Sequence, residues 1–197
     1  MRKILAVLIA GLLIISLGCS EDDSDEYDSG IKIIMPLTIG NQWTYHNFTQ
    51  DTLDVQRDTT LSDLNIYKDT IIESVHWYIT TDNYPYKIGS LITHKDDGLW
   101  VYGLTPYLMI KYPADIFDTW SSPGGEYEYK MVAKGVILTV PAGTFSCYKY
   151  RGRPNDTEDS TLLYYAPGYG LIKSRFWPDN GTKDEHITEL YEMILIR

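Results

Sequence analysis

Residues 41–48 read Asn-Gln-Trp-Thr-Tyr-His-Asn-Phe, and this stretch decides the fold class. Polar and aromatic residues alternate along it, and this spacing places Trp43 and Tyr45 on the same face of an extended strand. Aromatic residues are enriched in strands because they pack well on a pleated, half-buried surface. The stretch therefore predicts a strand with one face against a core.

The same alternation recurs along the chain, which contains 17 tyrosines and 5 tryptophans. The further predicted strands are Ile71–Thr80, Lys87–His94, Leu99–Tyr102, Leu108–Tyr112, Glu126–Ala133, Val136–Val140, Phe145–Arg151, Leu162–Tyr165, Leu171–Trp177 and His186–Ile196. Turn signals such as Pro123-Gly124-Gly125 separate them. About eleven short strands at this spacing predict one all-β, mostly antiparallel domain over residues 31–197, with little helix beyond the N-terminal segment.

The last segment, Thr182–Arg197, allows two interpretations. Its Glu, Leu and Met content is compatible with a helix, whereas the spacing of Ile187, Tyr191 and Ile194 fits either structure. We favour a closing strand.

The N-terminus predicts export. Arg2 and Lys3 precede an apolar stretch from Ile4 to Leu17, a layout typical of a signal peptide covering residues 1–18. The stretch is shorter than the roughly 20 residues that a spanning helix needs. Because it ends in Gly18-Cys19, it resembles a bacterial lipoprotein signal. The resemblance implies cleavage before Cys19 and acylation of Cys19. An ordinary signal peptide that contains a cysteine is the alternative.

Residues 19–30 are acidic, since Glu21, Asp22, Asp23, Asp25, Glu26 and Asp28 lie there. We predict a disordered tether, because the segment has few apolar groups to offset the entropy of ordering. It resembles the surface-export tethers of Bacteroidetes-type lipoproteins; a solvated linker is the alternative. We expect a lipid-anchored protein at the outer membrane, on the periplasmic face or at the cell surface.

Charge and cysteine content narrow the partners. Loss of residues 1–18 removes Arg2 and Lys3 and moves the formal net charge from −10 to −12. The sequence shows no run of Lys and Arg, so we expect no nucleic-acid partner. The chain has one other cysteine, Cys147. If Cys19 is acylated, Cys147 has no cysteine in the chain with which to form a disulfide, and we predict that it is a small buried apolar residue.

Motifs for chemistry are sparse. The four histidines, His46, His76, His94 and His186, stand singly, and we predict no metal site from them. The acidic turns Asp96-Asp97-Gly98 and 155–159 lack the ligand order of a dedicated calcium loop. No Gly-x-Ser-x-Gly motif occurs, so we expect no enzymatic activity, no catalytic residues and no cofactor.

One pattern occurs twice. Pro36-x-x-Ile39-x-Asn41-x-Trp43 recurs as Pro113-x-x-Ile116-x-Asp118-x-Trp120. In each copy the proline stays outside the strand ladder, Asn or Asp favours a local turn, and Trp is the first core residue of the next strand. We interpret the two copies as the same local device at the start of two strands.

Three blocks carry a resemblance to a known family. They are Pro36–Tyr45, Val140–Cys147 and Tyr164–Lys173, and together they resemble an uncharacterised family of bacterial exported lipoproteins. The resemblance implies a single curved sheet or incomplete β-barrel, similar to the periplasmic lipoprotein-carrier folds. It supplies no activity and no catalytic residues.

Two functions follow as expectations. The first is a binding or carrier module whose concave, aromatic face takes a hydrophobic ligand or an envelope protein. The second is a structural or adhesive protein displayed at the surface. The membrane is the expected partner of the N-terminal lipid in both.

Overall fold

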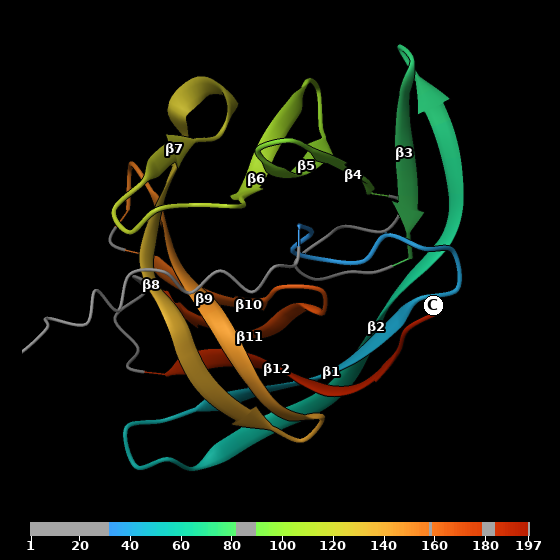
Figure 1. Ribbon diagram of the computed structural model, residues 1–197. Helices are drawn as coiled ribbons and strands as arrows, with labels where there is room; N and C mark the ends of the chain where they lie inside the picture. Colours follow the sequence, from blue (N-terminus) through green and yellow to red (C-terminus); the bar gives the residue numbers. More distant parts are fainter. Residues whose placement is uncertain (1–31, 82–89, 158, 179–183, 197) are drawn as a thin grey trace, which may run out of the picture.

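The stretch quoted above forms β1 (Gln42–Gln50), which lies in the middle of a twelve-stranded antiparallel sheet (Figure 1). The computed structural model describes residues 32–81, 90–157, 159–178 and 184–196. The other strands are β2 (Gln56–Ile72), β3 (Val75–Thr80), β4 (Leu91–Lys95), β5 (Gly98–Tyr102), β6 (Pro106–Lys111), β7 (Thr119–Ser121), β8 (Tyr127–Val140), β9 (Gly143–Pro154), β10 (Ser160–Ala166), β11 (Gly170–Trp177) and β12 (Glu185–Ile194). The predicted all-β, antiparallel fold is confirmed.

The sheet curls into an incomplete barrel. Its order is β6-β5-β4-β3-β2-β1-β12-β11-β10-β9-β8-β7, so the two edge strands are consecutive in the chain. They approach each other across the opening, where the indole Nε1 of Trp120 in β7 donates to the carbonyl of Met109 in β6 at 3.3 Å. No helix in the described ranges has the length and apolarity to cross a membrane.

The C-terminal segment is the predicted closing strand. β12 pairs with β1 from Gln42 opposite Ile194 to Gln50 opposite Glu185. β1 is therefore hydrogen-bonded on both sides, to β2, the next strand in the sequence, and to β12, the last strand.

Several predicted boundaries are wrong. β2 runs over 17 residues, but no strand was predicted over most of it, because its first half is polar and exposed. The predicted strand Ile71–Thr80 is interrupted at Glu73 and Ser74, whose φ values of 51° and 64° form a two-residue hairpin turn. Glu126–Ala133 and Val136–Val140 form one strand, β8, whose register shifts twice between Met131 and Val136.

The repeated Pro–Asn/Asp–Trp pattern has the predicted turn and strand start in both copies, but its tryptophan is fully buried only as Trp43, whereas Trp120 is partly buried against the core. The backbone N–H of Asn41 donates to the carbonyl of Thr38 at 3.0 Å. In the second copy, the backbone N–H of Asp118 donates to the carbonyl of Asp115 at 3.0 Å. In each case the strand begins at the next residue and the tryptophan is its second residue.

The segment before β1 runs inside the barrel (Figure 1). We call residues 33–37 the inner segment. Ile34 and Met35 are fully buried within it. Gly168 and Gly170 in the β10–β11 turn donate backbone hydrogen bonds to the carbonyls of Ile33 and Ile34, at 2.9 and 3.0 Å. The middle of the concave face is therefore filled by the chain itself.

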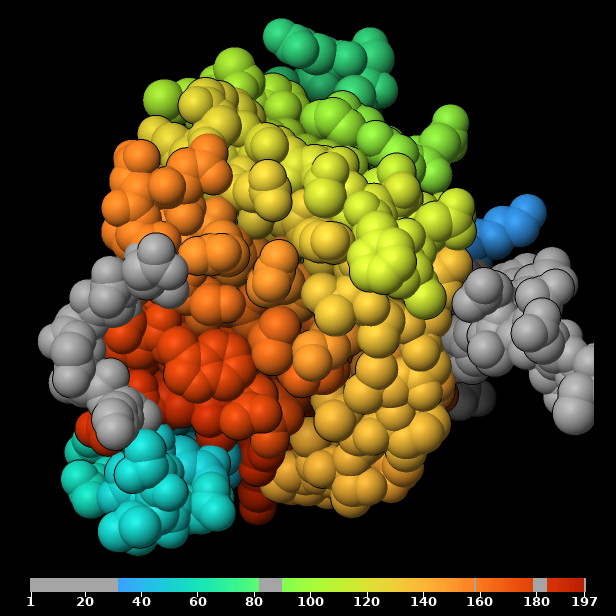
Figure 2. All heavy atoms as spheres, turned by 90° about the vertical axis from the view of Figure 1, so that its left-hand side faces the viewer, coloured from blue at the N-terminus to red at the C-terminus, as the bar shows by residue number. Residues whose placement is uncertain are grey.

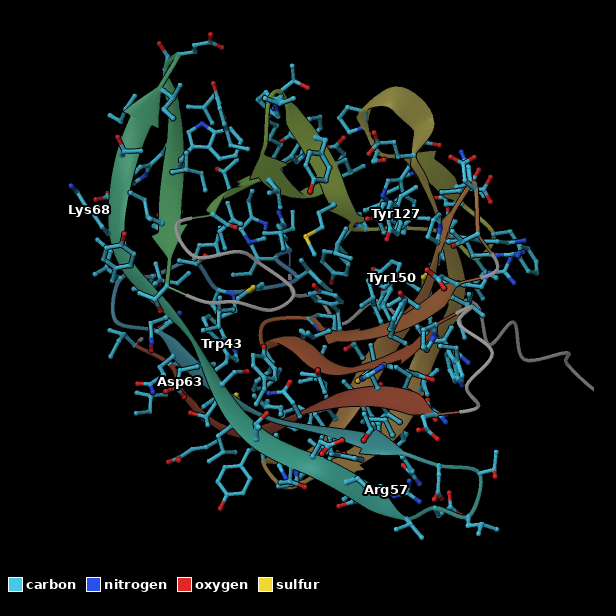
Figure 3. All side chains as sticks on the ribbon, turned by 180° about the vertical axis from the view of Figure 1, so that it is seen from behind. Trp43, Arg57, Asp63, Lys68, Tyr127 and Tyr150 are labelled. Carbon is cyan, nitrogen blue, oxygen red and sulfur yellow. The ribbon has the colours of Figure 1, made fainter. Side chains whose placement is uncertain are left out.

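Aromatic side chains fill the space around the inner segment. Tyr150 donates through its hydroxyl to the carbonyl of Lys111 at 3.0 Å, and this bond links β9 to β6 across the barrel. Trp43 donates to the carbonyl of Tyr169 at 2.6 Å, which ties β1 to the β10–β11 turn. Figure 3 shows Trp43 and Tyr150 inside the curved sheet. Among the described residues, the core extends from Ile34 to Leu190.

Candidate functional site

A pocket of about 500 Å³ remains at one end of β1, β2, β11 and β12. Its lining residues are Asn47, Phe48, Thr49, Asp58 and Thr60 from β1 and β2, and Phe176, His186, Ile187 and Thr188 from β11 and β12. Pockets that bind small molecules usually measure about 300–1,000 Å³, and this one falls inside that range.

Strand register places most of these residues on the concave face. Asn47 lies opposite Thr188 and Thr49 lies opposite His186 in the β1–β12 pair. Tyr45, two residues before Asn47, lies opposite Leu190, and both are fully buried in the core. Because directly opposite residues share a face and alternate residues along a strand share it too, the pocket continues the face that carries the core.

A β-bulge brings an acid to the pocket. The β1–β2 register shifts between Asn47 and Thr49, and Asp58 adopts a φ of 52°. Asp tolerates this left-handed conformation better than most residues. The hydroxyl of Thr49 donates to the carboxylate of Asp58 at 3.3 Å. Bulges often redirect a side chain next to a binding site, and this one supplies a negative charge.

Hydrogen bonds hold the polar side of the pocket in place. The hydroxyl of Thr188 donates to the side-chain oxygen of Asn47 at 2.8 Å, and the amide of Asn47 donates to the hydroxyl of Ser62 at 2.9 Å. The Asn47 amide therefore has both ends engaged, which fixes its orientation. Thr188 is itself buried.

The other side of the pocket is aromatic. The rings of Phe176 and His186 lie 6.0 Å apart between centroids and are tilted by 34°. An aromatic wall facing a row of hydroxyl and amide groups suits a ligand with both apolar and polar parts. The pocket can bind such a ligand by burial and hydrogen bonding.

The sequence-predicted residues have different outcomes. Cys19 and the whole signal and tether, residues 1–30, lie outside the described residues. Cys147 is fully buried in β9, and burial raises the pKa of its thiol to about 12, as suits the predicted apolar role. Asp97 accepts a 2.7 Å hydrogen bond from the indole of Trp100, so this acidic turn supports the β4–β5 hairpin.

The four histidines lie in separate surroundings. His46 contacts Glu189 at 3.9 Å, His76 contacts Asp69 at 2.5 Å, and His94 contacts the carbonyl of Met35 at 2.5 Å. His186 lines the pocket. Within the described part of the chain, no three His, Cys, Asp or Glu side chains are grouped so that they could hold a metal ion.

The sequence did not single out the pocket. Its residues come from two pairs of strands more than 100 positions apart, and each looks like an ordinary strand residue in isolation. The alternation predicted over residues 41–48 breaks at its end, because Phe48 comes three positions after Tyr45 and not two; this departure from alternation was the one signal in β1. That departure marks the bulge.

Comparison with known proteins supports the architecture. The fold is similar to that of a protein from Bacteroides fragilis that is described as a predicted exported protein with a YmcC-like fold. The TM-score is 0.54 at 12% identity, over 83% of this chain and 100% of that chain. This likeness shows the fold alone.

Two further solved structures score lower. A predicted lipoprotein from Parabacteroides distasonis gives a TM-score of 0.41 at 15% identity, over 83% of this chain and 99% of that chain. A LolA superfamily protein from Nitrosomonas europaea gives 0.33 at 10% identity, over 83% and 89%. No family model and no curated protein matches the chain.

Proposed function

We propose that this protein is a lipid-anchored binding protein of the bacterial outer membrane, and that it holds a small hydrophobic or amphipathic ligand on its concave face. The pocket between Phe176, His186 and Asn47 is the observation that carries the proposal. It lies on the face that carries the core, yet it is open where the rest of that face is packed.

The filled centre limits the size of the ligand. Ile34 and Met35 occupy the middle of the barrel, where a carrier of long acyl chains would need space. The site therefore takes a small ligand, or one end of a longer molecule whose remainder lies outside. Asp58 disfavours an anionic group beside it and favours a hydrogen-bond donor or a cation.

A dye titration tests the pocket. The probe is N-phenyl-1-naphthylamine, whose fluorescence rises in apolar surroundings. Phe176→Glu places a charge on the aromatic wall, so the dye should bind at least about ten times more weakly, which corresponds to a loss of about 1.4 kcal/mol. Tyr191→Glu is the control, because Tyr191 is half exposed and is absent from the pocket lining. Equal binding by the two variants would show that the dye does not use this pocket.

Acyl labelling tests the anchor. Cells that express the protein are fed a palmitate analogue that can be tagged. Cys19→Ala should abolish incorporation, and Cys147→Ala should leave it intact, since Cys147 is buried in the folded domain. Label that persists in Cys19→Ala would exclude the anchor.

A structural or adhesive role at the cell surface is the second candidate. It is favoured by the packed centre of the concave face, which a protein without a ligand can tolerate. A wild-type protein that binds no dye and carries no copurified molecule would support this second role.

A further inference from the structure

The fold gathers basic residues that are scattered in the sequence. Lys130 in β8 lies directly opposite Arg151 in β9, and Arg151 lies opposite Leu162 in β10. Lys149 lies opposite Tyr164 in the same pair of strands. We call Lys130, Lys149 and Arg151, with Phe117 beside them, the basic face.

Strand alternation shows that this face points outward. Met131 and Tyr150, the sequence neighbours of Lys130 and Arg151, are fully buried in the core. Since successive side chains of a strand point to opposite faces, Lys130 and Arg151 lie on the convex side of the barrel. Figure 2 views this side, where β8, in yellow, and β9 and β10, in orange, form a broad surface.

The positive charges of the basic face are not neutralised within the described residues. Other basic residues are paired: Lys111 with Asp118, Lys134 with Asp115, Lys173 with Glu189 and Arg175 with Glu185. No such pair involves Lys130, Lys149 or Arg151 in this part of the chain. In this acidic protein of net charge −10, three cations on adjacent strands thus have no ion-pair partner among the described residues, although Lys130 lies over the ring of Phe117 and Lys149 over that of Tyr164.

An exposed aromatic residue borders these cations. Phe117 is 70% exposed, and the ammonium group of Lys130 lies 4.8 Å from the centre of its ring. Its φ of 76° is unusual for a bulky residue. Two backbone hydrogen bonds hold the turn, from the amide of Phe117 to Met131 and from the amide of Met131 to Asp118. The fold therefore keeps an apolar ring outside in a strained conformation.

We propose that the basic face binds an anionic phospholipid bilayer, with Phe117 inserted among the lipids. Charge complementarity supports this occupant, because clusters of Lys and Arg are attracted to anionic headgroups and an apolar ring adds burial at the interface. The inference rests on the proposed anchor, since 12 residues separate Cys19 from Lys32, and the 13 residue-to-residue steps span at most about 45 Å when extended. Such a tether keeps the domain within reach of the bilayer.

Vesicle flotation tests the proposal without the anchor. The sample is the chain from residue 19 onward with Cys19→Ser, which retains every core residue that the structure describes. Vesicles contain phosphatidylcholine alone or with 30% phosphatidylglycerol. We expect binding to the anionic vesicles only, and weaker binding as salt is raised.

Paired variants locate the binding surface. Lys149→Gln with Arg151→Gln should weaken binding about 30-fold, because each basic residue near an anionic surface contributes a factor of about five. Phe117→Ser should also weaken it. Arg57→Gln with Lys68→Gln is the matched control: it removes the same charge from β2, a strand that pairs with β1 and β3 and not with β8, β9 or β10.

Three results would overturn the proposal. They are equal binding to neutral and anionic vesicles, an equal loss in the control, and binding to a soluble acidic polysaccharide with none to vesicles. Because the assay uses neither the pocket nor the anchor, its failure would leave the proposed ligand site standing.

Discussion

Gly170 shows at the scale of one residue how the turn and the inner segment depend on each other. Its φ is 96°, a conformation that suits glycine, and its Cα faces Met35. A Cβ added there would lie 3.0 Å from the Cγ of Met35. The motif Pro167-Gly168-Tyr169-Gly170 therefore makes the turn and also leaves space for the buried segment.

Gly170→Ala should cost more stability than the backbone conformation alone explains. A residue other than glycine in the left-handed region costs about 1–2 kcal/mol. The clash with Met35 should add about 1–3 kcal/mol. Gly124→Ala is the control, because Gly124 has a φ of 79° and no atom within 4 Å of its added Cβ. Urea unfolding measures both variants, and equal losses would contradict the close packing of Gly170 on Met35.

His94 should make stability fall at mildly acidic pH. Burial lowers the pKa of its imidazole, although hydrogen bonds to the carbonyls of Met35 and Gly98 oppose this effect. In the unfolded chain the pKa of this imidazole is near 6.5. Below that pH, the unfolded chain therefore binds a proton at His94 that the folded chain does not yet bind. Stability is then lost as pH falls from 7 towards 5, by at most about 1.4 kcal/mol per pH unit.

His94→Gln keeps a side-chain donor for Met35 and removes the titration. Its unfolding free energy should change less than that of the wild type between pH 7 and pH 5. Parallel plots of unfolding free energy against pH for the two proteins would show that His94 does not contribute to the pH dependence of stability.

At the scale of elements, the inner segment behaves as part of the core. Met35 is fully buried, so Met35→Ala should destabilise the protein by about 2–5 kcal/mol. Ile33→Ala is the matched control, because Ile33 is 40% exposed, and it should cost well under 1 kcal/mol. Similar small losses of stability for Met35→Ala and Ile33→Ala, measured by thermal or urea unfolding, would mean that the inner segment is not part of the packed core.

The elements differ in how far the sequence predicts them. β1 was predictable because Trp43 and Tyr45, two residues apart, are aromatic and face the core. Most of β2 was not, since Gln56–Leu61 is exposed and its strand structure depends on pairing with β1. The inner segment was missed because Ile33, Ile34 and Met35 form a short apolar run without period, whose burial depends on a turn 130 residues later.

At the scale of the whole molecule, the antiparallel barrel and its closing strand follow from alternation and turn residues. The pocket and the basic face do not, because each is assembled from strands that are distant in the sequence. Lys130, Lys149 and Arg151 look like isolated cations in the sequence, and pairing of β8, β9 and β10 brings them together. A single chain in one curled sheet thus presents a packed interior, an open pocket and a charged outer face.

Native mass spectrometry of the protein purified from its own envelope tests the central claim most directly. The claim predicts a reproducible adduct of one small molecule on the wild type, which is lost in Phe176→Glu and retained in Tyr191→Glu. A wild-type mass without any adduct, or an adduct that survives Phe176→Glu, would contradict a ligand site in this pocket.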